Sequence, residues 1–193
     1  AKALSTDPQL VTAVGAAPTR EQYDTLSKAV PTIVRPAQYQ DWQVPWEVQT
    51  LEIGKSVGLP DAASKKISEA RQHVEALRAE HPELEAKTGV VVTGSPDGGV
   101  SIYGPGDGRA QTLADYGLNF PQALKSTITN GFYGSISAER LDLLDAADVV
   151  VVVNGDLLTG HDLGAQVSAL TAADAGVLAC VHVREVDDAR AYG

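Results

Sequence analysis

The stretch SISAERLDLLDAADVVVVVNGD, residues 135–156, decides the fold class. Ser137 followed by an acidic first turn is typical of the start of a helix. The valine run 149–153 shows no polar alternation, which is typical of a parallel strand buried on both faces. A weaker copy of the pattern, AKALSTDPQLVTAVG, occupies residues 1–15. The chain therefore repeats a helix–strand–loop unit, once near each end.

The first part of the chain has a strand–helix–strand pattern. Residues 9–14 form an apolar run closed by Gly15, and the β-branched residues 32–35 form another. Between them Thr19 and Gln22 have the spacing of a capping box, so a helix is expected to follow Thr19 and to end before Pro31. This order predicts a parallel α/β unit.

Two helical stretches follow. The first, residues 46–58, is interrupted by glycine at positions 54 and 58. The second is expected to start at Asp61 as its cap and to end before Pro82, with one narrow apolar stripe. A helix of this length with a single stripe suits a strut between two lobes, and an outer helix on one sheet is the alternative.

A second α/β region begins at the strand 88–94, which a short turn joins to the strand 98–104. A glycine-rich turn then enters a helix that ends at Gly117, and the last strand lies within residues 175–186. We therefore predict an α/β fold of two lobes with mainly parallel sheets bridged by one long helix. The expected domains are an N-terminal lobe part (1–45), a helical connector with the strut (46–82) and a C-terminal lobe (83–193).

Composition excludes several classes of function. The 25 acids and 15 bases among 193 residues give a net charge of −10, which is unsuited to nucleic-acid phosphates. No apolar run reaches the roughly 20 residues of a membrane span. The four histidines are scattered, so no intrinsic metal site is expected, and the single Cys180 suits a buried core position.

The sequence also lacks local signatures of catalysis. Residues 104–108, GPGDG, have neither the dinucleotide-binding spacing nor a phosphate-loop lysine, so they predict a tight turn. No serine or cysteine nucleophile motif occurs.

Aromatic and basic residues cluster at the ends of predicted strands. They are Arg35, Tyr39 and Trp42 after one strand, Tyr103 and Arg109 beside another, and Phe132 and Tyr133 before the Ser137 helix. Arginine binds oxygen anions in bidentate geometry, and aromatic faces pack on rings or cations. Arginines directed into a cleft of this acidic protein are expected to form a local positive region.

Taken in order, APTREQYDTLSKAVPTIVRP, the W…IGKSVG segment, the long helix, IYGPGDGR and SAERLDLLDAADVVVV resemble the class III periplasmic substrate-binding proteins. The most similar group is the ferric-siderophore-binding components of ABC importers, of actinobacterial type. The resemblance covers nearly the whole chain. It implies that the protein is a receptor, not an enzyme, which binds a ferric siderophore in an interlobe cleft and delivers it to an ABC permease.

The resemblance also implies roles for individual residues. Glu139 matches the second-lobe glutamate that docks on the permease, and its first-lobe counterpart is expected at or just before Ala1. Siderophore binders often carry arginine where this chain has Asn154. The candidate ligand-binding residues are Gly15, Arg35, Tyr39, Trp42, Tyr103, Arg109, Tyr133, Asn154, Arg190 and Tyr192.

The remaining expectations follow from the same resemblance. The protein is expected to be an extracytoplasmic monomer, at the periplasm or cell surface and lipid-anchored in its full-length form, and this chain to lack parts of both ends. It needs no intrinsic cofactor, because iron arrives bound by its chelator. The alternatives are a haem or corrinoid receptor of the same fold and an α/β enzyme with a cleft active site.

Overall fold

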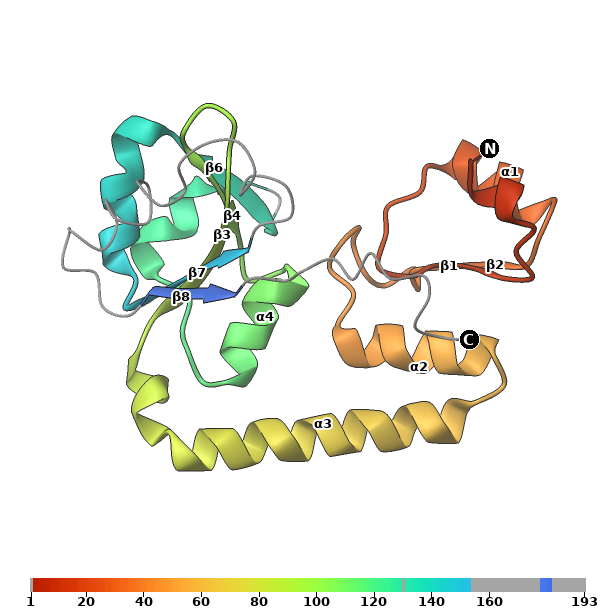
Figure 1. The fold of residues 1–193 in the computed structure, drawn as a ribbon, viewed down its shortest axis with the longest axis horizontal. Helices are drawn as coiled ribbons and strands as arrows, with labels where there is room; N and C mark the ends of the chain where they lie inside the picture. Colours follow the sequence, from red (N-terminus) through yellow and green to blue (C-terminus); the bar gives the residue numbers. More distant parts are fainter. Residues whose placement is uncertain (1, 130, 154–177, 182–193) are drawn as a thin grey trace. The chain divides into compact units, whose positions relative to one another are not determined.

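The computed structural model describes residues 2–129, 131–153 and 178–181. They form two compact units, Ala1–Ala79 and Glu80–Gly193, which are described separately. Figure 1 labels their α-helices and most of their strands. The α/β fold class expected from the sequence is confirmed, whereas the separation of residues 46–82 as a connector of their own stays a prediction.

The first unit opens with a parallel strand pair. After the short 3-10 helix η1 (Lys2–Thr6), β1 (Val11–Ala13) pairs with β2 (Thr32–Val34), and α1 (Arg20–Ser27) connects them. The capping box is present: Thr19 Oγ1 accepts from the Gln22 N–H at 3.2 Å, and Gln22 Oε1 accepts from the Thr19 N–H at 2.9 Å. The predicted strand–helix–strand unit is therefore correct.

Two helices complete this unit, α2 (Trp46–Ser56) and α3 (Pro60–Glu80). The expected break at Gly54 is wrong, because α2 continues through it and uses it for close packing. A Cβ at Gly54 would lie 2.4 Å from the Cβ of Ala63, so only glycine lets the two helices approach there. The guanidinium of Arg71 on α3 binds Glu47 on α2 at 2.9 Å.

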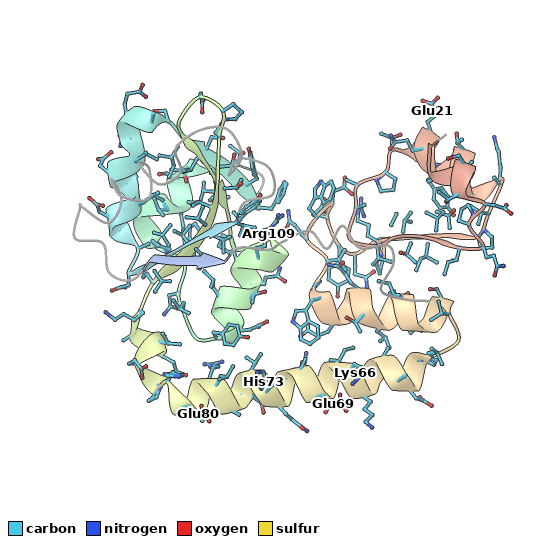
Figure 2. All side chains as sticks on the ribbon, in the orientation of Figure 1. Glu21, Lys66, Glu69, His73, Glu80 and Arg109 are labelled. Atoms are coloured by element: carbon cyan, nitrogen blue, oxygen red, sulfur yellow. The ribbon has the colours of Figure 1, made fainter. Side chains whose placement is uncertain are left out.

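The long helix α3 is continuous over 21 residues, as its apolar stripe predicted. Figure 2 marks Lys66, Glu69 and His73 along it. Its start differs from the prediction: the helix begins at Pro60, which is favoured in a first turn because it has no N–H to leave unsatisfied. Asp61 therefore lies inside the first turn and is not the cap.

A six-stranded mixed sheet forms the second unit, in the order β5-β6-β4-β3-β7-β8 (Figure 1). The strands are β3 (Gly89–Gly94), β4 (Val100–Tyr103), β5 (Ile128–Thr129), β6 (Tyr133–Ile136), β7 (Val149–Val153) and β8 (Leu178–Val181). Pairs β3–β7 and β7–β8 are parallel, and the pairs from β3 to β5 are antiparallel. The predicted β3–β4 hairpin thus lies in the middle of the sheet, where β3 joins the antiparallel strands β4, β6 and β5 to the parallel strands β7 and β8.

The helices of this unit are η2 (Pro82–Ala86), α4 (Gly108–Asp115), η3 (Gln122–Thr127) and η4 (Ala138–Ala146). The core lies on the sheet face covered by η3 and η4, where Leu124 and Leu144 are fully buried against Ile102. On the opposite face α4 packs against β3, and Val91 is buried there. This packing explains why β3 is a continuous run of apolar residues.

Two expectations for residues 137–153 are wrong in part. A helix does begin after Ser137, which takes the N-cap position, but it is a 3-10 helix with a non-helical Arg140, and the Ser137 side chain makes no capping bond to the backbone. In β7, Val150 and Val152 are buried, whereas Val149, Val151 and Val153 are only half-buried in the described structure. The described helices η3 and η4 cover only the face that carries Val150 and Val152.

Candidate functional site

The strongest group of candidate residues lies in the second unit and contains Tyr103, Arg109 and Tyr133. Tyr103 and Tyr133 are direct partners across β4 and β6, and their rings meet edge to face with centres 6.3 Å apart. The guanidinium carbon of Arg109, labelled in Figure 2, lies 3.8 Å from the centre of the Tyr103 ring, which is a cation–π contact. The structure therefore brings together three residues that the sequence separates by up to 30 positions.

Strand geometry explains why the two tyrosines share a surface. Successive side chains of a strand point to opposite faces, so Tyr103 and Ser101 lie opposite the buried Ile102 and Val100. The Tyr133 hydroxyl and Ser101 Oγ are 2.7 Å apart and form a hydrogen bond. This bond fixes the Tyr133 ring, which remains 37 % exposed.

The turn between β4 and α4 positions Arg109. A Cβ at Gly104 would lie 2.7 Å from Ile128, so glycine is required where the turn meets that residue. The Gly106 N–H donates to the Gly131 carbonyl at 3.0 Å, which ties the turn to the segment before β6. GPGDG is thus the tight turn that the sequence predicted, and it directs the start of α4 toward Tyr103.

Asp107 is the functional residue that sequence reasoning missed. It is the N-cap of α4 and only 2 % exposed, and its carboxylate holds the Arg109 side chain through two bonds of 2.8 Å, to Nε and Nη2. Hydrogen bonding to this carboxylate, opposed in part by burial, raises the pKa of the Arg109 guanidinium. An aspartate two positions before an arginine at a helix start was the available signal.

A second group lies in the first unit and surrounds Arg35. Its Nη1 donates to the Tyr39 carbonyl at 2.7 Å, and its Nε binds the Asp41 carboxylate. Trp42 follows with a positive φ of 65° and is 46 % exposed. Arg35 therefore holds the loop that presents Trp42, and Asp41 is a further residue that sequence reasoning missed.

A hollow of about 390 Å³ adjoins Arg35. It is lined by Pro18, Arg20, Tyr23, Val34, Arg35, Ala37 and Asp41. Gly15 lies elsewhere in the unit, against α2: a Cβ there would be 2.4 Å from the Gln49 side-chain oxygen. Tyr39 and Trp42 are not among the residues that line the hollow.

The expected local positive region is absent at Arg35 and Arg109, the two predicted arginines within the described residues. Arg35 is paired with Asp41 and Arg109 with Asp107, so each guanidinium charge is balanced within its own unit. Asn154, Arg190 and Tyr192 lie outside the described residues, so their predicted roles stay predictions.

Glu139 is an exposed residue at the start of η4. A hydrogen bond from the Ser137 side chain, helped by the backbone, lowers the pKa of the Glu139 carboxyl although nearby Asp97 opposes the shift. The Ser137 side chain thus holds the carboxylate in its charged form and makes no capping bond to the helix.

No group of three or more histidine, cysteine, aspartate or glutamate residues suited to a metal ion occurs within 2–129, 131–153 and 178–181. In the same ranges, no helix has the length and apolar character needed to cross a membrane. Cys180 lies in β8, and its expected burial stays a prediction.

The sequence model of the periplasmic binding protein family matches residues 2–169. The chain belongs to this family. Membership confirms the resemblance drawn from the sequence, and it implies an extracytoplasmic location. No curated protein is similar enough in sequence to count as a match.

Solved structures support the same fold. PiaA of Streptococcus pneumoniae TIGR4, an iron-uptake ABC transporter substrate-binding protein, is 25 % identical with a TM-score of 0.68, over 93 % of this chain and 63 % of PiaA. The structure of PiaA in complex with ferrichrome is 26 % identical with a TM-score of 0.69, and the match covers 93 % of this chain and 62 % of PiaA. A periplasmic solute-binding protein of Mycobacterium smegmatis shares the fold at 22 % identity, with a TM-score of 0.67. The match covers 93 % of this chain and 61 % of that protein. The chain thus spans about three-fifths of these proteins.

Proposed function

We propose that this chain belongs to a receptor that binds a ferric siderophore and delivers it to an ABC permease. The observation that carries the proposal is family membership over residues 2–169 together with the likeness to PiaA, whose structure holds ferrichrome. The receptor makes and breaks no covalent bond. Iron is cargo held by its chelator, so the protein contacts the organic shell and needs no metal ligands of its own.

The Tyr103–Arg109–Tyr133 group supports this function chemically. Aromatic rings and a stacked guanidinium give a broad, rigid surface that loses little side-chain entropy on binding. In the first unit, Arg35, Tyr39 and Trp42 are the matching candidates for contact with the chelate. Asn154, Arg190 and Tyr192 remain proposed contacts on the strength of the sequence resemblance.

Glu139 is the proposed contact with the permease. Its carboxylate is exposed and charged, which suits an arginine or lysine on a partner protein. The receptor is proposed to act as a monomer and to be lipid-anchored in its full-length form.

A thermal-shift panel tests the assignment against its alternatives. A ligand that binds the folded state raises the melting temperature in proportion to the logarithm of its concentration over Kd. We expect ferric siderophores to raise it, and haem, a corrinoid and nucleotides to leave it unchanged. A shift with haem or the corrinoid alone would reassign the ligand within the family, and hydrolysis of a nucleotide would replace the receptor with an enzyme.

A further inference from the structure

The arginine in the Tyr103–Arg109–Tyr133 group is paired with Asp107, and the pair as a whole carries no net charge toward a ligand. Both oxygens of Asp107 bind its guanidinium, through Oδ1 to Nε and Oδ2 to Nη2, each at 2.8 Å. Paired bonds of this kind place the negative charge against the positive one in a fixed geometry. A ligand approaching Tyr103 therefore meets an ion pair and two aromatic rings.

Asp107 cannot turn away to release the arginine. Its side chain is 98 % buried, as its 2 % exposure shows, and Oδ1 also accepts the Arg109 backbone N–H at 2.8 Å as the cap of α4. Breaking the pair would leave a buried carboxylate without its counter-charge, which is strongly unfavourable. The neutral state of the pair is thus part of the folded structure.

In the described strands of the second unit, no side chain on this sheet face adds a compensating positive charge. The side chains that share this sheet face on β4 and β6 with the tyrosines are the neutral hydroxyls of Ser101 and Ser135. In the first unit, Arg35 is likewise bound by Asp41, and Arg20 in the wall of the hollow binds Asp24. The whole chain carries a net charge of −10. An anionic ligand would therefore be repelled at long range and would find no free cation at Arg35 or Arg109, the candidate arginines within the described residues.

We infer that the ligand is an electrically neutral ferric tris-hydroxamate chelate and not a triply anionic ferric tricatecholate. Three hydroxamates each carry one negative charge and balance Fe(III), whereas three catecholates each carry two and leave a surplus of three. A neutral chelate needs only stacking and hydrogen bonds, which Tyr103, Tyr133 and the outer guanidinium edge provide. This inference rests on the proposed function and names the chemical class of its substrate.

The test compares ferrichrome, a neutral tris-hydroxamate, with ferric enterobactin, a tricatecholate, by equilibrium dialysis against the protein. We expect ferrichrome to bind at least about 100-fold more tightly. The variant Asp107→Asn keeps an N-cap side chain but frees the charge of Arg109, so affinity for the anionic chelate should rise about tenfold. Asp142→Asn removes the same charge from an exposed pair with Arg140 and should change neither affinity.

Each outcome decides the inference. Equal or tighter binding of the anionic chelate by the unmodified protein would overturn it, and so would an unchanged ratio in folded Asp107→Asn. If Asp107→Asn fails to fold, the salt dependence of binding by the unmodified protein is measured instead. The Kd for ferrichrome should change less than twofold between about 0.05 and 0.5 M salt. A larger loss of ferrichrome affinity would overturn the inference. Failure of every chelate to bind would instead overturn the proposed function, and the inference with it.

Discussion

Arg109 stacks on the face of Tyr103 with its guanidinium carbon 3.8 Å from the ring centre, while Asp107 holds the same guanidinium from its edge. The three side chains form one rigid element at the junction of β4 and α4. Rigidity favours binding, because side chains that are already ordered lose no further freedom when a ligand arrives.

Tyr103→Leu tests the contribution of this stack to ligand binding. Loss of the ring removes an aromatic surface proposed to contact the ligand and the face that orders Arg109, together about 1–1.5 kcal/mol of binding free energy, so affinity for ferrichrome should fall about tenfold. Equilibrium dialysis measures the change. Tyr116→Leu, on a tyrosine that ends α4, is the matched control and should bind as before. An equal loss in both variants would assign the effect to folding.

Thr19→Ala tests the capping box of α1. The substitution removes the acceptor of the Gln22 N–H and should lower the free energy of unfolding of the first unit by about 1 kcal/mol. Both tryptophans, Trp42 and Trp46, lie in this unit, so urea unfolding followed by tryptophan fluorescence reports on it. Thr25→Ala, at an exposed position of the same helix, is the control and should lower the free energy of unfolding by clearly less than Thr19→Ala. An equal loss of unfolding free energy in both variants would show that the loss in Thr19→Ala does not come from the capping bond.

The lowered pKa of Asp148 predicts that the stability of the second unit depends on pH. Hydrogen bonds from the Thr88 backbone and from the Lys87 and Thr88 side chains lower its pKa from 3.8 to about 2. A carboxyl whose pKa is lower in the folded state stabilises that state above the unfolded pKa, and the effect is lost as pH falls from about 4 to about 2.

Asp148→Asn should therefore lower the melting temperature at about pH 6 and have little effect near pH 2. Thermal unfolding followed by circular dichroism at several pH values measures this. Asp142→Asn, on an exposed acid of η4, should shift the melting temperature much less at any pH. If the melting temperature of Asp148→Asn differs from that of the unmodified protein by the same amount from about pH 6 to about pH 2, Asp148 is not the source of the pH dependence.

Glu139→Ala tests the proposed contact with the permease. Removing an exposed charge that faces a cationic partner should weaken docking about tenfold while leaving ferrichrome affinity unchanged. Asp142→Ala, a neighbouring exposed acid on η4, should dock normally. Binding of each loaded variant to the purified permease measures the effect. A variant that docks normally but loses ferrichrome would overturn the role given to Glu139.

Local sequence patterns predicted most elements of the fold. The capping box at Thr19, the β-branched strands and the long helix depend on neighbours within a few positions, which periodicity reports directly. The use of Gly54 for close packing could not be predicted, because its reason is Ala63 on the next helix. The 3-10 turns after Ser137 could not be predicted either, because tertiary packing decides there between an α-helix and a 3-10 helix.

The candidate site was predicted by residue type but not by charge. Tyr103, Arg109 and Tyr133 do come together, because strand pairing places the tyrosines opposite each other and a tight turn brings the arginine back. The sequence also contained Asp107, yet its burial and its pairing with Arg109 follow only from three-dimensional contacts. That single carboxylate balances the positive charge expected at Arg109, and the inferred neutrality of the ligand rests on it.

The most direct test of the account is titration of the protein with ferrichrome while the fluorescence of Trp42 and Trp46 is recorded. We predict saturable quenching with a Kd below about 1 μM, equivalent to about 8 kcal/mol of binding free energy. Iron-free ferrichrome, which lacks the compact chelate, should quench far less. Absence of saturable quenching by ferrichrome, together with no change in melting temperature on its addition, would contradict the account.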